Sequence, residues 1–411
     1  MPKKSDVAMI RDLAARVAEI AALPVQEEKR SLWRKLNALK PERSMVMVDE
    51  VCWTEFRAFD ELRPRCEDRE CRDWERHLRR TLFQWEHFPV DMVVEPIAWV
   101  PKAFGFNWFG MQVQEETVAT DPTNNIVAHK YVNQLEKDDD LEKFQKPVVW
   151  KMEDETERRM TVAHELFDGL LEVRELGANF PMTFWDLIAT LMGVENALWA
   201  LVDRPEFVHK LLARMTGAFV QTLDQLEEQG LLCGPQSIVH CTGGWTDQLP
   251  ASGYDPEKPR TQDIWMMGWA QMLGTVSPRM FREFEIDYVK GIAERFGLVY
   301  YGCCEPLDNK MELVRQIPNV RKVSMSPWVN QERGAAAIGR DYVFSRKPNP
   351  ALLAFDDFDA AAVRKDLEST RAICAREGCP LEIILKDIST LRHEPERLFS
   401  WGEIAMETAQ R

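Results

Sequence analysis

Two hydrophobic patterns alternate along the chain. Apolar positions recur every three to four residues over 5–40 and 206–228, which predicts amphipathic helices there. Short apolar runs bounded by polar or turn-forming residues predict buried strands, with a weaker one near 171–180. The clearer runs lie at 45–51, 90–99, 237–241, 298–303, 321–326, 342–345 and 381–385. Because helical segments separate these roughly eight strands, we expect parallel β/α units that close into a (β/α)8 TIM barrel of class α/β.

The stretch 105–154 has a different texture. Polar and apolar residues alternate around 112–115, and the sequence Asp121-Pro122-Thr123-Asn124-Asn125 is typical of a turn. This pattern predicts a β-rich insertion with a hairpin. We therefore expect an N-terminal helical extension over 1–42 and a barrel over 43–411, with the 105–154 insertion above the barrel mouth.

Charge and cysteine content narrow the class of protein. The formal net charge of -15 and the pI near 5.1 argue against nucleic acid or an anionic membrane as a partner, and favour a small-molecule substrate. Nine cysteines, an odd number without a signal peptide, indicate reduced thiols in a cytoplasmic protein. The longest apolar stretch, 180–194, carries Asp186 and is too short to span a bilayer.

The segment 297–307 places reactive groups at the end of an apolar run. Alternation along a strand would put Cys303 and Glu305 on one face and Cys304 on the other, unless the strand bulges at its end. His240 ends another short apolar run. Since the C-terminal ends of parallel strands converge, we expect these side chains to line one central pocket. The alternatives are a hydrogen-bonded core histidine and cysteines that act as small buried hydrophobes.

Other predicted strands also end in polar residues. Lys386 and Asp387 follow a buried run, where a lysine needs a partner or a ligand, and a structural ion pair weighs equally with a substrate role. Glu305, Lys386 and Asp387 are the catalytic candidates. The substrate-binding candidates are Glu50, Trp53, Glu95, Trp328, Lys347 and Asn349.

Two passages resemble a known family. P-M-T-F-W-D-L-I-A-T-L-M-G-V-E-N-A-L-W-A-L-V-D-R-P-E-F-V-H-K-L-L at 181–212 and V-S-P-R-M-F-R-E-F-E-I-D-Y-V-K-G-I at 276–292, which a strand and thiols follow, look like the uroporphyrinogen decarboxylase superfamily. The resemblance covers 160–411 and implies a (β/α)8 barrel. The arginine-rich R-Q-A-G-R motif of true decarboxylases has no counterpart before Trp108.

The other branch of that superfamily transfers methyl groups to or from a corrinoid protein or coenzyme M, commonly with zinc bound by an H-x-C element. Cys304 matches the cysteine of this element, but Gly302 stands at its histidine position. If zinc is bound, a set different from the family element must supply the ligands, and we expect His240, Cys303 or Cys304, and Glu305, because tetrahedral zinc accepts N, S and carboxylate O.

Three functions follow as hypotheses. The first is a methyltransferase that moves a methyl group from a small methylated compound, such as an aromatic methyl ether or a methylamine, to a corrinoid (cobalamin) supplied by a partner protein. The second is a decarboxylase or other lyase in which Arg346, Lys347 and Lys386 hold substrate carboxylates without metal. The third is a non-catalytic binding barrel. Each of these three functions is compatible with a homodimer.

Overall fold

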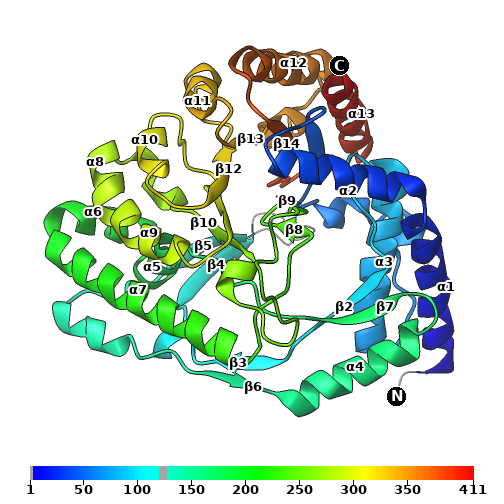
Figure 1. The fold of residues 1–411 in the computed structure, drawn as a ribbon, viewed down its shortest axis with the longest axis horizontal. Helices are drawn as coiled ribbons and strands as arrows, with labels where there is room; N and C mark the ends of the chain where they lie inside the picture. The colour runs from blue at the N-terminus through cyan, green and yellow to red at the C-terminus, as the bar shows by residue number, and fades with distance from the viewer. Residues whose placement is uncertain (1–2, 120–126) are drawn as a thin grey trace.

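The computed structural model describes residues 3–119 and 127–411, and its centre is a parallel sheet of six strands. In spatial order the strands are β1 (Met45–Val48), β14 (Leu381–Leu385), β13 (Val343–Arg346), β12 (Val320–Met325), β11 (Leu298–Tyr301) and β10 (Trp265–Gly268) (Figure 1). Every neighbouring pair is parallel. The predicted α/β class is confirmed.

Two more parallel strands lie beside this sheet. β2 (Ile97–Pro101) pairs with β7 (Glu172–Leu176), and a single bridge between Met182 and Gly268 links the chain after β7 to β10. No ladder joins β2 to β1 within the described residues. The arrangement is compatible with a TIM-barrel-like fold, but the described strands do not form a closed barrel.

Helices surround the strands (Figure 1). They are α1 (Lys4–Ala21), α2 (Pro24–Asn37), α3 (Arg69–His87), α4 (Glu153–Phe167), α5 (Phe184–Met192), α6 (Val194–Asp203), α7 (Pro205–Glu228), α8 (Pro278–Phe281), α9 (Asp287–Ala293), α10 (Met311–Val314), α11 (Gln331–Ile338), α12 (Ala360–Glu377) and α13 (Glu396–Gln410). No single helix of the described chain is long and apolar enough to cross a bilayer, and α5 with α6 would meet that test only as a pair bent by 104°.

The two faces of the sheet differ in chemistry. Val299 and Tyr301 of β11 pack into the large apolar core, whereas Tyr300 lies on the other face with Trp265. The same alternation puts Lys322 and Glu382 on this second face, where both side chains are fully buried. A buried polar face must be satisfied by other polar groups.

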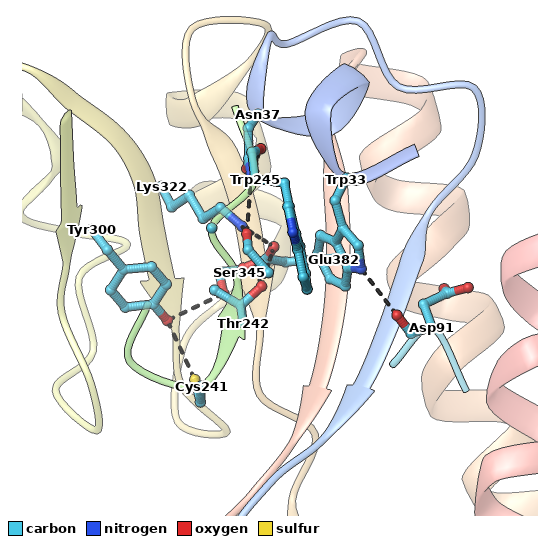
Figure 2. A network of polar contacts seen from close by, with 12 residues as sticks. Trp33, Asn37, Asp91, Cys241, Thr242, Trp245, Tyr300, Lys322, Ser345 and Glu382 are labelled. Carbon is cyan, nitrogen blue, oxygen red and sulfur yellow. Dashed lines mark hydrogen bonds and ion pairs between the residues drawn. The ribbon is translucent and has the colours of Figure 1, made fainter. Parts of the chain in front are cut away.

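A short hairpin satisfies this face. β8 (Ile238–Val239) and β9 (Thr242–Gly243) pair antiparallel near the centre of the molecule (Figure 1). Lys322 Nζ lies 2.7 Å from Glu382 Oε2 and donates to the Gly243 carbonyl at 2.9 Å, and Thr242 Oγ1 donates to Glu382 at 2.8 Å (Figure 2). The buried ion pair thus ties the hairpin to β12 and β14.

Helix α2 covers the hairpin near its base. Trp33 donates from its indole nitrogen to the Asp91 carbonyl at 3.0 Å, and its ring lies 6.5 Å from the ring of Trp245 (Figure 2). Asn37 donates to the carbonyls of Gly243 and Trp245 at 3.0 and 2.8 Å. Helix α2 is therefore part of the central packing.

The 105–154 segment is β-rich, as predicted. β3 (Phe104–Phe106) pairs with β6 (Val149–Lys151), and β4 (Glu115–Ala119) pairs with β5 (Val127–Tyr131), both antiparallel. The turn predicted at 121–125 lies outside the described residues. Phe109 stacks on Phe219 of α7, and Gln225 of the same helix accepts from Val149 N. The position of this segment over a barrel mouth stays a prediction.

Some predicted strands have different bounds. The run 90–99 yields a strand only from Ile97, because proline at 96 has no N–H to donate to a ladder. The run 237–241 is one arm of the β8–β9 hairpin and not a strand of the main sheet. β10, a run of four residues, was not predicted.

Candidate functional site

The C-terminal ends of β1, β11 and β14 bring together two thiols, a lysine and two carboxyl groups. Lys386 Nζ lies 3.5 Å from Cys303 Sγ and 3.7 Å from both Glu50 Oε2 and Asp387 Oδ2. β12 and β13 separate β11 from β14 in the sheet, so this contact shows that the sheet curves strongly. The predicted convergence of strand ends is present for these five residues, which we call the thiol–lysine site.

The two cysteines lie together. Their sulfur atoms are 3.6 Å apart, and Cys304 Sγ lies 4.0 Å from Asp387 Oδ2. Strict alternation would have put them on opposite faces, but β11 ends at Tyr301 and Gly302 adopts a φ of 96°, which turns the chain. The two thiols therefore do not lie on opposite faces, because the chain leaves the regular strand before it reaches them.

The two thiols differ in acidity. Cys303 is buried and Cys304 is half-buried. The hydrogen bond with Cys303 lowers the pKa of Cys304 although burial opposes this, and the same hydrogen bond, with burial, raises the pKa of Cys303. Since the thiolate is the reactive form, Cys304 is the reactive member of the pair.

Lys386 and the two carboxyl groups form a proton-sharing group. Burial alone would lower the pKa of Lys386, but Cys303 and the carboxylates of Asp387 and Glu50 raise it. Burial and the hydrogen bond with Glu50 raise the pKa of Asp387 to about 6. Asp387 N also donates to Glu50 at 3.1 Å. The pair can hold one proton near neutral pH.

His240 lies near this group but is not hydrogen-bonded to it in the described structure. Its ring is 4.7 Å from that of Trp269 and 5.3 Å from that of Tyr300, and its buried Nε2 has no hydrogen-bond partner among the described residues. Burial first, and then the charges of Lys386 and Lys347, lower its pKa to about 3. The imidazole is therefore neutral and can exchange a hydrogen bond with a ligand.

Lys347 is a buried cation with only uncharged neighbours in contact. It is 3% exposed and donates to Tyr300 Oη and Ser345 Oγ, each at 2.5 Å. No carboxylate of the described residues lies within 4.0 Å of its nitrogen. The neighbouring Arg346 points elsewhere, toward the Ser326 carbonyl at 3.0 Å and Asp366 at 3.5 Å. Of these two adjacent cations, only Lys347 contacts Tyr300 and so lies beside His240.

Glu305 has a structural role. Its carboxylate is buried and accepts from Ala270 N at 2.8 Å and from Cys303 N at 2.9 Å, one bond to each oxygen. Burial raises its pKa although both bonds oppose this. Glu305 therefore holds the turn after β11 against the end of β10, and its expected catalytic and metal-binding roles do not fit this geometry.

Four predicted substrate-binding residues lie away from both the thiol–lysine site and Lys347. Glu95 precedes β2 and accepts from Ser237 Oγ at 2.6 Å. Trp53 packs edge-on against Phe83 at 6.2 Å within an aromatic cluster. Trp328 is 69% exposed, and Asn349 caps the short helix that begins at Pro350. Each follows or precedes a strand, but their side chains serve packing, capping or other surfaces.

The predicted zinc ligands do not form a metal-binding cluster. Within the described chain, only Glu61, Glu86 and His87 form a group of three His, Cys, Asp or Glu side chains whose ligand atoms all lie within 4.8 Å of one another. No three of His240, Cys303, Cys304 and Glu305 lie mutually that close in the described chain, although the two sulfur atoms are 3.6 Å apart. His240, Cys303, Cys304 and Glu305 as placed do not fit a three- or four-ligand zinc site.

Three residues near the site were missed in the sequence. Trp269, Tyr300 and Ser345 surround His240 and Lys347. The alternation of side chains along a strand could have identified Tyr300. Tyr300 lies two residues before Gly302 and on the face opposite Val299 and Tyr301, which face outward. Its hydroxyl made it unsuitable for an apolar core without a partner.

Comparisons with known proteins add little to this geometry. No family model and no curated protein matches the chain. Among 21 matching chains of solved structures is a methyltransferase from Methanosarcina mazei, which is 11% identical, has a TM-score of 0.49, and is aligned over 92% of this chain and 97% of its own. A likeness at this level does not bear on activity. The fold and the site define an α/β protein with a thiol–lysine site at the C-terminal ends of its strands.

Proposed function

We propose that the protein is an enzyme that transfers a methyl group from a small methylated compound, an aromatic methyl ether or a methylamine, to a corrinoid carried by a partner protein. The observation that carries the proposal is the thiol–lysine site, in which three strand ends supply a reactive thiol, a buried ammonium and a proton-sharing carboxyl pair. The passages 181–212 and 276–292 resemble the superfamily, and within it the match of Cys304 to the cysteine of the H-x-C element, with no R-Q-A-G-R counterpart before Trp108, supports the choice of methyl transfer.

The carboxyl pair supplies the proton that this reaction needs. When the methyl carbon leaves its oxygen or nitrogen, the electron pair of the broken bond stays on the heteroatom. Asp387, with its pKa of about 6 and Glu50 beside it, donates a proton to that heteroatom as a general acid. Lys386 donates a hydrogen bond to the same atom, which stabilises the developing charge.

The remaining groups position the methyl donor. Cys304, the more acidic of the two thiols, places its sulfur beside the methyl carbon, which gains positive character during transfer. Neutral His240 and its neighbour Trp269 offer a flat wall and a hydrogen-bonding nitrogen. A corrinoid, when bound, supplies a cobalt nucleophile that accepts the methyl group. No step requires zinc.

One observation favours a second function. Lys347 is a buried cation with no carboxylate in contact, which suits a substrate carboxylate held between Lys347 and Lys386. That arrangement is expected of a decarboxylase or another lyase that acts without metal. In the methyltransferase hypothesis, Lys347 instead donates a hydrogen bond to a polar group of the substrate.

An assay with free reduced cobalamin separates the two functions. The wild-type protein, in a chelator, is incubated with methyl aryl ethers and methylamines, and methylcobalamin is followed by absorbance while the demethylated product is quantified. We expect one product molecule per methyl group transferred. Release of carbon dioxide from carboxylated analogues, with no methylcobalamin from any donor, would favour the lyase.

A further inference from the structure

A large cavity lies away from the thiol–lysine site. Its volume is about 1110 Å³, and it is lined from both the β2–β7 pair and β10, which no ladder joins among the described residues. Its walls include Trp99 of β2, Leu176 of β7 and Trp265 of β10. Small-molecule sites commonly enclose about 300–1,000 Å³, so this cavity can hold a ligand of several rings. None of the five residues of the thiol–lysine site lines it.

The walls of the cavity are aromatic and fixed in place. Trp99, Trp245, Trp265 and Tyr254 contribute rings. Trp265 donates from its indole nitrogen to the Gly244 carbonyl at 2.9 Å, and its backbone N–H and carbonyl both bind the Gln236 side chain, at 2.9 and 3.1 Å. Trp265 is fully buried and supports the wall of the cavity, and the half-buried rings of Trp99, Trp245 and Tyr254 present the surface for a planar ligand.

The charges of the lining are balanced. Three cations and three carboxylates contribute: Arg34, Lys102, Arg174, Glu95, Glu175 and Glu257. The cations are already paired, for example Lys102 with Glu175 at 3.2 Å and Arg174 with Glu172 at 2.6 Å. An anionic ligand would therefore have to displace existing ion pairs.

Glu95 retains capacity for a hydrogen bond. One of its oxygens accepts from Ser237 Oγ at 2.6 Å, and the other accepts no hydrogen bond within the described residues. A carboxylate at the wall of an aromatic cavity selects a ligand that can donate a proton in a hydrogen bond.

We propose that this cavity is a second ligand site, which binds an uncharged, planar aromatic compound of more than one ring that donates an N–H or O–H group to Glu95. The site is separate from the proposed reaction. Ser237 and Gly244, on the two arms of the β8–β9 segment, line the cavity, whereas His240 at the turn faces Trp269 and Tyr300.

The probe for the test is N-phenyl-1-naphthylamine, which is uncharged, aromatic and carries one N–H donor, and whose fluorescence rises in an apolar site. We expect saturable binding of one molecule per chain. Glu95→Gln should weaken binding about fivefold and Trp245→Leu at least tenfold, because the first removes the charged acceptor and the second removes a stacking wall.

Matched controls are Glu116→Gln and Trp108→Ala, which change an exposed carboxylate and a 64% exposed indole outside the cavity. Both should bind the probe like the wild type. Circular dichroism checks that each variant is folded. If Trp245→Leu does not fold, Glu95→Gln alone decides the test. Absence of saturable binding by the wild type, or equal affinity in folded Glu95→Gln and the controls, would overturn the proposal.

Discussion

At the scale of single residues, three of the candidate functional residues have unusual backbone conformations. Glu50, His240 and Asp387 have positive φ values of 52°, 53° and 57°, in a region that side chains with a Cβ seldom adopt. Each such residue costs about 1–3 kcal/mol and persists only where its surroundings hold it. The three residues are also candidates for proton transfer or ligand contact. This coincidence supports a functional role for the strand ends.

The carboxyl pair makes the proposed methyl transfer depend on pH. Asp387 is an acid with a pKa of about 6, so its protonated form is available below that pH and is lost above it. The rate with saturating donor should therefore fall by about tenfold per pH unit above pH 6. Measuring kcat between pH 5 and 8 checks this expectation.

Substitution tests whether Asp387 causes that decline. Asp387→Asn should lower kcat and remove the dependence on pH, whereas Asp356→Asn, at a carboxylate that is 90% exposed and paired with Arg392, should keep the wild-type profile. The assignment fails if Asp387→Asn shows the same decline as the wild type.

His240 should make the free energy of unfolding decrease as the pH falls. Its pKa is about 3 in the folded chain and 6.5 in its unperturbed state, so the unfolded chain binds the extra proton between these values. Stability from this group is thus complete above pH 6.5 and is lost as pH falls toward 3. Between pH 6.5 and 5 the loss should reach about 2 kcal/mol.

Denaturant unfolding at pH 7 and pH 5 measures this loss. The decline should be smaller in His240→Gln than in the wild type, while His164→Gln, at an exposed histidine, should decline as the wild type does. A wild type and a His240→Gln variant that lose equal stability would show that His240 is not buried as a neutral group.

At the scale of elements, the buried Lys322–Glu382 pair attaches the β8–β9 hairpin to the sheet. Both side chains are fully buried, and both contact Thr242. Lys322→Met should cost about 3–5 kcal/mol, because it leaves Glu382 charged and buried without its partner. The double variant Lys322→Met/Glu382→Leu should recover much of this loss.

Urea unfolding of both variants checks this expectation. The exposed pair of Arg315 and Asp341, 2.8 Å apart, provides the control, and Arg315→Met should cost no more than about 1 kcal/mol. If Lys322→Met costs as little as the control, the ion pair does not anchor the hairpin.

The elements that the sequence predicted well are those whose apolar runs are long and bounded. The run 381–385 is β14 to the residue, because five buried positions lie between Pro380 and Lys386. β10 was missed because its four residues, W-M-M-G, include no β-branched residue and end in glycine, which is a weak strand pattern. The run 237–241 was misassigned because a hairpin that is buried on its inner side resembles a buried strand, and only the reversal at His240 distinguishes them.

At the scale of the whole molecule, chain closure and side-chain direction depend on contacts distant in sequence. The convergence of the C-terminal ends of parallel strands predicted that Cys303 lies near Lys386, which follows 83 residues later in the sequence. It could not show that Glu305 turns to Ala270 N, since that follows from Gly302 and the end of β10. Much of the lining of the large cavity likewise comes from the 233–259 segment, which no local pattern positions.

The central claim is that the thiol–lysine site carries out methyl transfer. Its most direct test compares methylcobalamin formation by Cys304→Ala and Cys379→Ala in a chelator. Cys379 is a matched control because it is also partly exposed, also has a buried cysteine, Cys374, beside it, and lies outside the site. Cys304→Ala should lose about 100-fold or more in rate while Cys379→Ala stays within about twofold of the wild type. Wild-type activity in Cys304→Ala would contradict the claim.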